Sequence, residues 1–252
     1  MPYRKEQFVI GKFYHIVLKG IDANEIFKNI DDYYRGIFSI YEFNDTKMVE
    51  IRERRRTRLK LKEQIKRANK ESQKIIKQVR GGPTSADSRL KLVEVLAFCI
   101  MPNHIHLLLR QIQDGGIKKF MVKFGTGYGG YFNRKYKHQG HVFQKQFTAV
   151  HIKNEDQLKV VFVYIHTNPV SLIEPKWKDL GIKDQKRANK FVKNYKWSSH
   201  SDYIGKKNFP SVTDRKFISK IMGYEEGCKN FVGNWIKYKD QIRKYANISL
   251  GL

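Results

Sequence analysis

The chain has 252 residues and a formal net charge of +26, because 50 lysines and arginines stand against 24 aspartates and glutamates. A charge of this size predicts a polyanionic partner, and nucleic acid is favoured over an anionic membrane surface because no apolar run of about 18 residues and no signal-peptide pattern occur. We therefore expect a globular cytoplasmic protein with no membrane partner, and its two cysteines are too few for a disulfide framework or a cysteine-based zinc site.

The first predicted elements are a strand and a helix. Residues 12–18 are rich in aromatic and β-branched side chains and are soon followed by Gly20, which predicts a strand. Residues 24–43 carry apolar side chains at roughly helical spacing, which predicts a helix packed on a sheet.

A basic helical insertion is predicted next, at about residues 46–88. Few acidic residues are available to pair with its lysines and arginines, so contact with a nucleic-acid backbone is favoured over a solvated helix with i,i+4 charge pairs. Its candidate DNA contacts are Arg54, Arg55, Arg56 and Arg58. Glycine and proline at 81–83 then break the helix and begin a linker back to the sheet.

Two histidines mark the next pair of predicted strands. Residues 92–100 and 104–110 are apolar runs joined by Met-Pro-Asn, which predicts an antiparallel pair. Successive strand side chains alternate sides, so His104 and His106 share one face. Two neutral imidazoles in this arrangement can hold one divalent metal, although a polar sheet face that binds nothing also fits the pattern. His15, in the first strand, could approach the same metal or serve only as a strand residue.

A glycine-containing helix and a basic, aromatic segment follow. Residues 117–136 predict the helix, and because no strand immediately precedes its four glycines, they favour a close backbone approach over a dinucleotide-binding loop. Residues 133–141 predict a loop that mixes cations with aromatic rings, a combination that suits phosphate neutralisation and base stacking. The candidate DNA contacts in and after this segment are Arg134, Lys135, Lys137 and Lys145.

A further helix is predicted to begin at Asn154, a favourable N-cap, and to end before Pro169. Tyr164 and Asn168 lie four residues apart on it, one above the other. If His104, His106 and Asn168 bind one ion beside Tyr164, the mixed nitrogen and oxygen ligands suit Mg²⁺ or Mn²⁺. Such an ion could polarise a phosphodiester that the tyrosine attacks, leaving a phosphotyrosine able to rejoin the strand to another hydroxyl.

The remaining chain, 176–252, is expected to be a basic helical extension of a principal domain at 1–175. It contains a polar stretch at 176–196, a predicted packing turn at 197–203 and one or two amphipathic helices at 214–245. These helices could serve dimerisation or cover the sheet, so a monomer and a homodimer both stay open.

Several of these segments together resemble the single-tyrosine HUH transposases, in particular the REP-associated tyrosine transposases. The motifs that carry the resemblance are, in order, Met-Pro-Asn-His-Ile-His-Leu-Leu-Leu at 101–109, Tyr-Phe-Asn-Arg-Lys-Tyr at 131–136, Gly-His-Val-Phe-Gln at 140–144, Tyr-Ile-His-Thr-Asn-Pro-Val at 164–170 and Trp-Ser-Ser at 197–199. The resemblance implies a ferredoxin-like α+β fold whose central antiparallel sheet carries the two histidines and whose flanking helix carries the tyrosine.

The same resemblance implies roles for individual residues. His104 and His106 become metal ligands, Asn168 the third ligand, and Tyr164 the nucleophile that forms a 5′-phosphotyrosine on single-stranded DNA beside a hairpin. Tyr131 and Tyr128 are the rival nucleophiles. The alternative functions are a non-catalytic protein that binds a DNA hairpin, and a replication initiator or relaxase with the same chemistry, although the chain contains no resemblance to a helicase P-loop.

Overall fold

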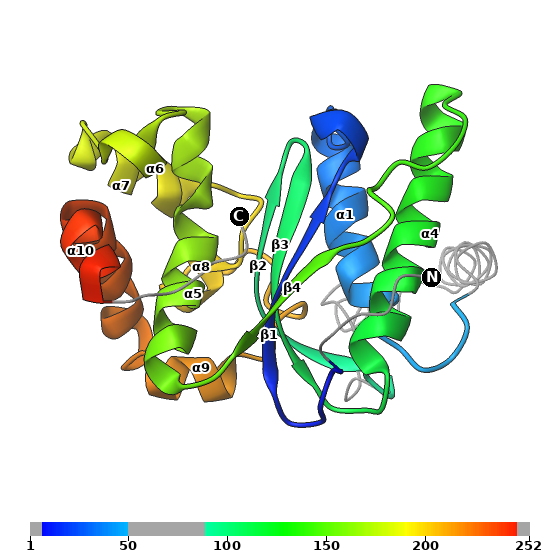
Figure 1. Ribbon diagram of the computed structural model, residues 1–252, viewed down its shortest axis with the longest axis horizontal. Helices are drawn as coiled ribbons and strands as arrows, with labels where there is room; N and C mark the ends of the chain where they lie inside the picture. The colour runs from blue at the N-terminus through cyan, green and yellow to red at the C-terminus, as the bar shows by residue number, and fades with distance from the viewer. Residues whose placement is uncertain (1–6, 50–88, 246–252) are drawn as a thin grey trace, which may run out of the picture.

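The computed structural model describes residues 7–49 and 89–245, arranged around one four-stranded sheet (Figure 1). The strands are β1 (Phe13–Lys19), β2 (Val93–Met101), β3 (His104–Gln111) and β4 (Thr148–Ile152), in the order β2-β3-β1-β4 with every adjacent pair antiparallel. With a helix between β1 and β2 and another between β3 and β4, this is the ferredoxin-like topology. The predicted α+β fold and the predicted strand pair are confirmed.

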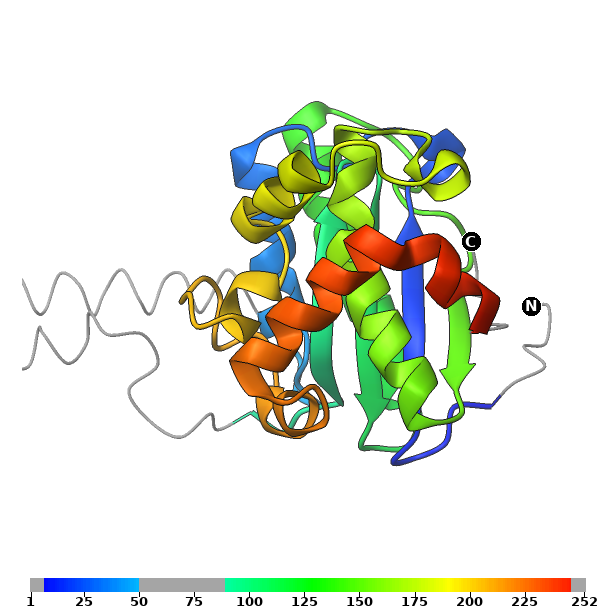
Figure 2. The same cartoon turned by 90° about the vertical axis from the view of Figure 1, so that its left-hand side faces the viewer.

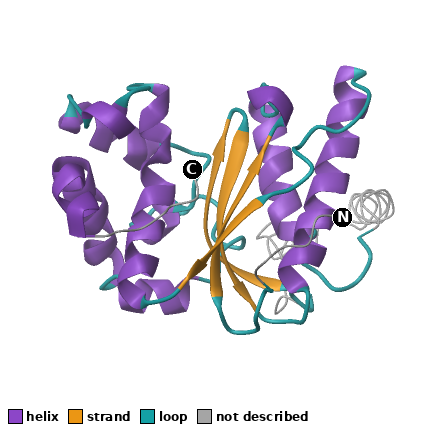
Figure 3. Cartoon of the chain, in the orientation of Figure 1, coloured by secondary structure: helices purple, strands orange, loops and turns teal. Residues whose placement is uncertain are grey.

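Helices cover both faces of the sheet, which makes three layers (Figure 3). On one face lie α1 (Ile30–Glu42) and α4 (Gly116–Tyr136), whose apolar sides pack with alternate strand residues into a first core. Gly127 permits the close contact between α4 and the end of α1, because a Cβ there would lie 2.0 Å from the Phe43 ring. Of the four glycines predicted to allow a close backbone approach, Gly127 is the one for which this prediction is confirmed.

The other face is covered by α5 (Glu155–Thr167) and by the helices that follow it. The Asn154 side chain accepts a hydrogen bond from the Gln157 N–H, which confirms the predicted N-cap. A 3₁₀ helix (Asn168–Leu172) continues α5, and the later helices pack around these two helices (Figure 2). These are α6 (Trp177–Leu180), α7 (Gln185–Asn194), α8 (His200–Tyr203), α9 (Arg215–Ile221) and α10 (Tyr224–Tyr245).

The C-terminal helices share a second core with β2 and α5, to which Val192, Ile218 and Trp235 contribute. They therefore cover the sheet, one of the two roles expected for them, while the division of the chain at residue 175 stays a prediction. No helix in the described part of the chain is long and apolar enough to span a membrane.

The Trp197-Ser198-Ser199 segment lies along the outer edge of β2. The Ile100 N–H donates to the Trp197 carbonyl at 2.9 Å, and the Ser199 N–H donates to the Phe98 carbonyl at 3.0 Å. The Ser199 hydroxyl also accepts from the Phe98 N–H and contacts His166 Nε2 of α5 at 2.8 Å. This turn therefore covers a sheet edge that would otherwise be exposed, and it links α5 to that edge, as the predicted packing role requires.

One sequence prediction needs adjustment, and another falls mostly outside the described residues. The predicted loop at 133–141 begins inside α4, which continues to Tyr136, so Arg134 and Lys135 lie on a helix. Most of the basic insertion, with Arg54, Arg55, Arg56 and Arg58, lies outside the described residues.

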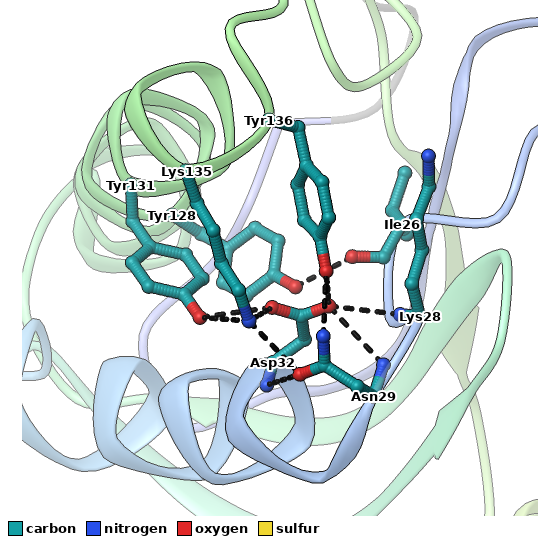
Figure 4. Close-up of polar contacts among 8 residues, drawn as sticks. All are labelled: Ile26, Lys28, Asn29, Asp32, Tyr128, Tyr131, Lys135 and Tyr136. Atoms are coloured by element: carbon teal, nitrogen blue, oxygen red, sulfur yellow. Dashed lines mark hydrogen bonds and ion pairs between the residues drawn. The ribbon is translucent and has the colours of Figure 1, made fainter.

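A buried carboxylate joins α1 to α4 (Figure 4). Asp32 has no exposed surface, and it receives hydrogen bonds from the hydroxyls of Tyr131 and Tyr136, from the Lys135 ammonium at 2.7 Å, and from the backbone N–H groups of Lys28 and Asn29. Burial alone would raise the pKa of Asp32, but the hydrogen bonds from Lys135, Tyr136 and Tyr131 outweigh it and lower the pKa below its usual value.

Replacing Asp32 by asparagine is therefore expected to lower the free energy of unfolding by about 2 kcal/mol at pH 7, measured by urea denaturation. Because the folded-state pKa is lowered, the stabilisation by the carboxylate is complete above its unfolded value and disappears as the pH falls through the folded one. The difference between Asp32→Asn and wild type should therefore shrink below about pH 4.

The matched control is Asp31→Asn, which alters the exposed neighbouring carboxylate in the same first turn of α1. It should cost less than about 1 kcal/mol. Equal effects of the two substitutions would show that Asp32 acts only through the helix dipole.

Candidate active site

Three histidines meet on the sheet face that α5 covers. His104 and His106 in β3 lie with ring centroids 4.8 Å apart, which confirms that they share a face. His15, in the neighbouring strand β1, faces the same side, and its Nε2 lies 3.0 Å from His106 Nδ1. The contact between His15 and the predicted pair follows from the pairing of β1 with β3.

Tyr164 packs against this cluster from α5. Its ring lies 5.7 Å from that of His106 and 5.9 Å from that of His15, in edge-on contacts. Lys178 of α6 approaches from the same layer and donates a hydrogen bond of 3.1 Å to the Tyr164 hydroxyl. The phenol oxygen therefore has a cation beside it.

Burial keeps the two predicted metal ligands uncharged. It lowers the pKa of His104 to about 4, with further lowering by the positive charges of Lys178 and Lys19. The pKa of His106 is also well below its ordinary value, chiefly through burial and then through His104 and His15. Both rings are thus neutral at pH 7, which is the form of imidazole that binds a metal.

The hydrogen-bond partners of the two rings fit a metal-binding role. His104 Nδ1 lies 2.6 Å from the Asn103 side-chain oxygen, and His106 Nδ1 contacts His15, so Nδ1 is engaged in both rings. His106 Nε2 is buried with no hydrogen-bond partner among the described residues. In a metal site, a hydrogen bond to the ring nitrogen that does not bind the ion fixes the orientation of the ring, and the Nδ1 contacts of both histidines are of this kind. Among the described residues, no group of three or more His, Cys, Asp or Glu side chains could hold a metal ion.

Asn168, the predicted third ligand, is buried at the end of α5. Its side-chain nitrogen donates to the backbone carbonyl of Tyr164 at 2.9 Å, so the amide secures the end of the helix that carries the tyrosine. Its role as a metal ligand stays a prediction.

The rival tyrosines lie on the opposite face of the sheet, in α4. The buried Tyr128 donates its hydroxyl to the Ile26 carbonyl, and the hydroxyl of Tyr131 donates to Asp32 (Figure 4). Of the three candidate nucleophiles, Tyr164 is the one that the fold brings to the histidines.

The predicted DNA contacts among the described residues are Arg134, Lys135, Lys137 and Lys145. Arg134, Lys137 and Lys145 are exposed, whereas the ammonium of Lys135 is held in the ion pair with Asp32. Sequence reasoning missed Lys178, which lies in a stretch predicted only as polar, and it left the contact of His15 with His106 open. Sequence reasoning also missed the contact of Asn103 with His104, which the position of Asn103 directly before this histidine could have suggested.

Comparisons with known proteins give one family match, and it includes the residues of this cluster that lie in β3 and α5. Residues 53–168 match the family model "Transposase IS200 like", a span that includes both histidines, Tyr164 and Asn168. This part of the chain is therefore similar to the IS200-like transposases, and the predicted family resemblance is confirmed. No curated protein matches the chain. A solved structure titled "Structure of the REP associates tyrosine transposase bound to a REP hairpin" has a TM-score of 0.42 and 13% identity, over 86% of this chain and 96% of that chain.

The lowered pKa of His104 can be measured directly. Long-range ¹H–¹⁵N NMR of the metal-free protein should show a titration midpoint near pH 4, since burial and nearby cations oppose protonation. Lys178→Gln removes one of these cations and should raise the midpoint. A midpoint near 6.5 in wild type would mean that water reaches the ring.

Proposed function

We propose that this protein is a metal-dependent endonuclease and strand transferase that acts on single-stranded DNA next to a hairpin. The observation that carries the proposal is the packing of Tyr164 against His106 and His15 with Lys178 at its hydroxyl, within the region that matches the transposase family. The reaction would move the protein's own element or process dispersed palindromic repeats.

In the proposed reaction the Tyr164 oxygen attacks a DNA phosphorus. The new tyrosine–phosphorus bond replaces the bond from phosphorus to the 3′ oxygen, the phenol loses its proton, and the released 3′ oxygen gains one. The Lys178 ammonium, 3.1 Å from the phenol oxygen, can stabilise negative charge there during attack and during the reverse step. The 5′-phosphotyrosine keeps the energy of the broken bond, so attack by another 3′ hydroxyl rejoins the strand without ATP.

The neutral histidines fit a divalent ion in this reaction. His104 and His106 would hold Mg²⁺ or Mn²⁺ through Nε2, with Asn168 the proposed further ligand. When bound, the ion would polarise a phosphodiester oxygen. His15 has a positioning role, since its contact with His106 Nδ1 directs the opposite ring nitrogen to the ion.

A covalent-adduct assay tests the nucleophile. Wild type, incubated with Mn²⁺ or Mg²⁺ and labelled hairpin-containing single-stranded DNA from the flanks of its own gene, should form a protein–DNA species that survives denaturing electrophoresis. Tyr164→Phe should reduce this species by a factor of about a thousand or more, because no other group replaces the phenol oxygen.

The control is Tyr131→Phe, which should keep the adduct because its hydroxyl lies in the Asp32 cluster. If wild type bound the hairpin tightly but formed no adduct with either metal, the non-catalytic binding function would replace this proposal. An adduct that survived Tyr164→Phe would exclude Tyr164.

The positioning role of His15 predicts an effect on metal affinity. His15→Phe keeps a ring of similar size but removes the contact with His106 Nδ1, and it should weaken Mn²⁺ binding by about 10- to 100-fold in a calorimetric titration. His151→Phe is the control, because His151 contacts Tyr14 of the opposite sheet face and should leave the affinity unchanged. Equal affinities of His15→Phe and wild type would remove His15 from the site.

A further inference from the structure

A groove between α7 and α10 collects positive charge on the outer side of the α5 layer. The two helices lie against each other there (Figure 2), and the groove has a volume of about 710 Å³. Among the described residues, its lining contains five lysines and one carboxylate, that of Glu226. Glu226 pairs with Lys229 at 3.7 Å. The other four lysines are Lys186, Lys190, Lys193 and Lys206.

The sequence of α7 places three of these lysines in one row. Lys186, Lys190 and Lys193 are four and three residues apart, so they project from the same side of the helix over a length of about 10 Å. The opposite side carries Ala188 and Val192, which are buried in the second core. Because the core holds the opposite side of α7, the three lysines stay exposed and line the groove together.

The composition of the groove identifies the chemistry of its partner. Lysine is a point charge on a flexible stem, which suits phosphate groups without requiring one fixed geometry. Asn189 and Asn194 on α7 and Asn230 and Asn234 on α10 add amide donors of the kind that contact phosphate and sugar oxygens. No aromatic ring lines the groove among the described residues, and aromatic rings are what unpaired bases stack on. A duplex backbone therefore fits the groove better than unpaired bases do.

We propose that the α7–α10 groove binds the phosphate backbone of the duplex stem of the hairpin whose single-stranded flank reaches Tyr164. The inference rests on the proposed function. Lys178, which contacts the Tyr164 hydroxyl, lies in α6, and only residues 181–184 separate α6 from α7. The helix that approaches the nucleophile and the helix that carries the row of lysines are thus consecutive.

The test measures equilibrium binding of two DNAs to the full chain in EDTA, which prevents cleavage. One DNA is the hairpin with its flank, and the other is the flank alone. Lys190→Gln/Lys193→Gln should weaken hairpin binding about tenfold and reduce the slope of log affinity against log salt by about 2, since two phosphate contacts are lost. It should leave binding of the flank alone unchanged.

The matched control is Lys216→Gln/Lys220→Gln, which removes the same charge from exposed positions of α9 outside the groove. If both double variants weakened hairpin binding equally, the effect would come from overall charge alone. If the groove variant weakened binding of the flank as much as binding of the hairpin, the groove would bind single strands. Unchanged hairpin binding would also overturn the proposal. If wild type formed no adduct while the groove variant still lost hairpin binding selectively, the proposed reaction would be wrong, but the groove would still be a binding site for the hairpin stem.

Discussion

The covering of the sheet by helices on both faces determines the chemistry of the candidate site. Because α5 packs over the face that carries His104 and His106, these rings lose water and stay neutral, and an imidazole binds a metal only in that form. The same packing brings Tyr164 edge-on to His106. A sheet with one solvated face would offer the same histidines without either property.

The position of α5 depends in turn on the C-terminal part of the chain. The Trp197-Ser198-Ser199 segment pairs with β2 and contacts His166 of α5, and Lys178 reaches the Tyr164 hydroxyl from α6. Residues beyond 175 therefore help to build the site as well as cover it. This explains why a motif distant in sequence from the histidines accompanies them in the pattern that resembles the transposases.

Local patterns carried most of the successful predictions. Alternation along β3 placed His104 and His106 on one face, and the cap at Asn154 located the start of α5, because both signals lie within a few residues of chain. The approach of Lys178 to Tyr164 depends on tertiary packing and has no local signal. Lys135 shows the limit most clearly. The carboxylate that holds its ammonium lies 103 residues earlier in the chain, so no local pattern predicts this ion pair, and the DNA contact expected of Lys135 stays a prediction.

The covered edge of β2 also constrains how two copies of this chain can associate. An open edge strand presents unpaired backbone groups to which another chain can add a strand. Here the turn at 197–199 already occupies the β2 edge. A sheet continuous across two molecules would have to form at the opposite edge, where β4 is only five residues long and offers few backbone groups for pairing.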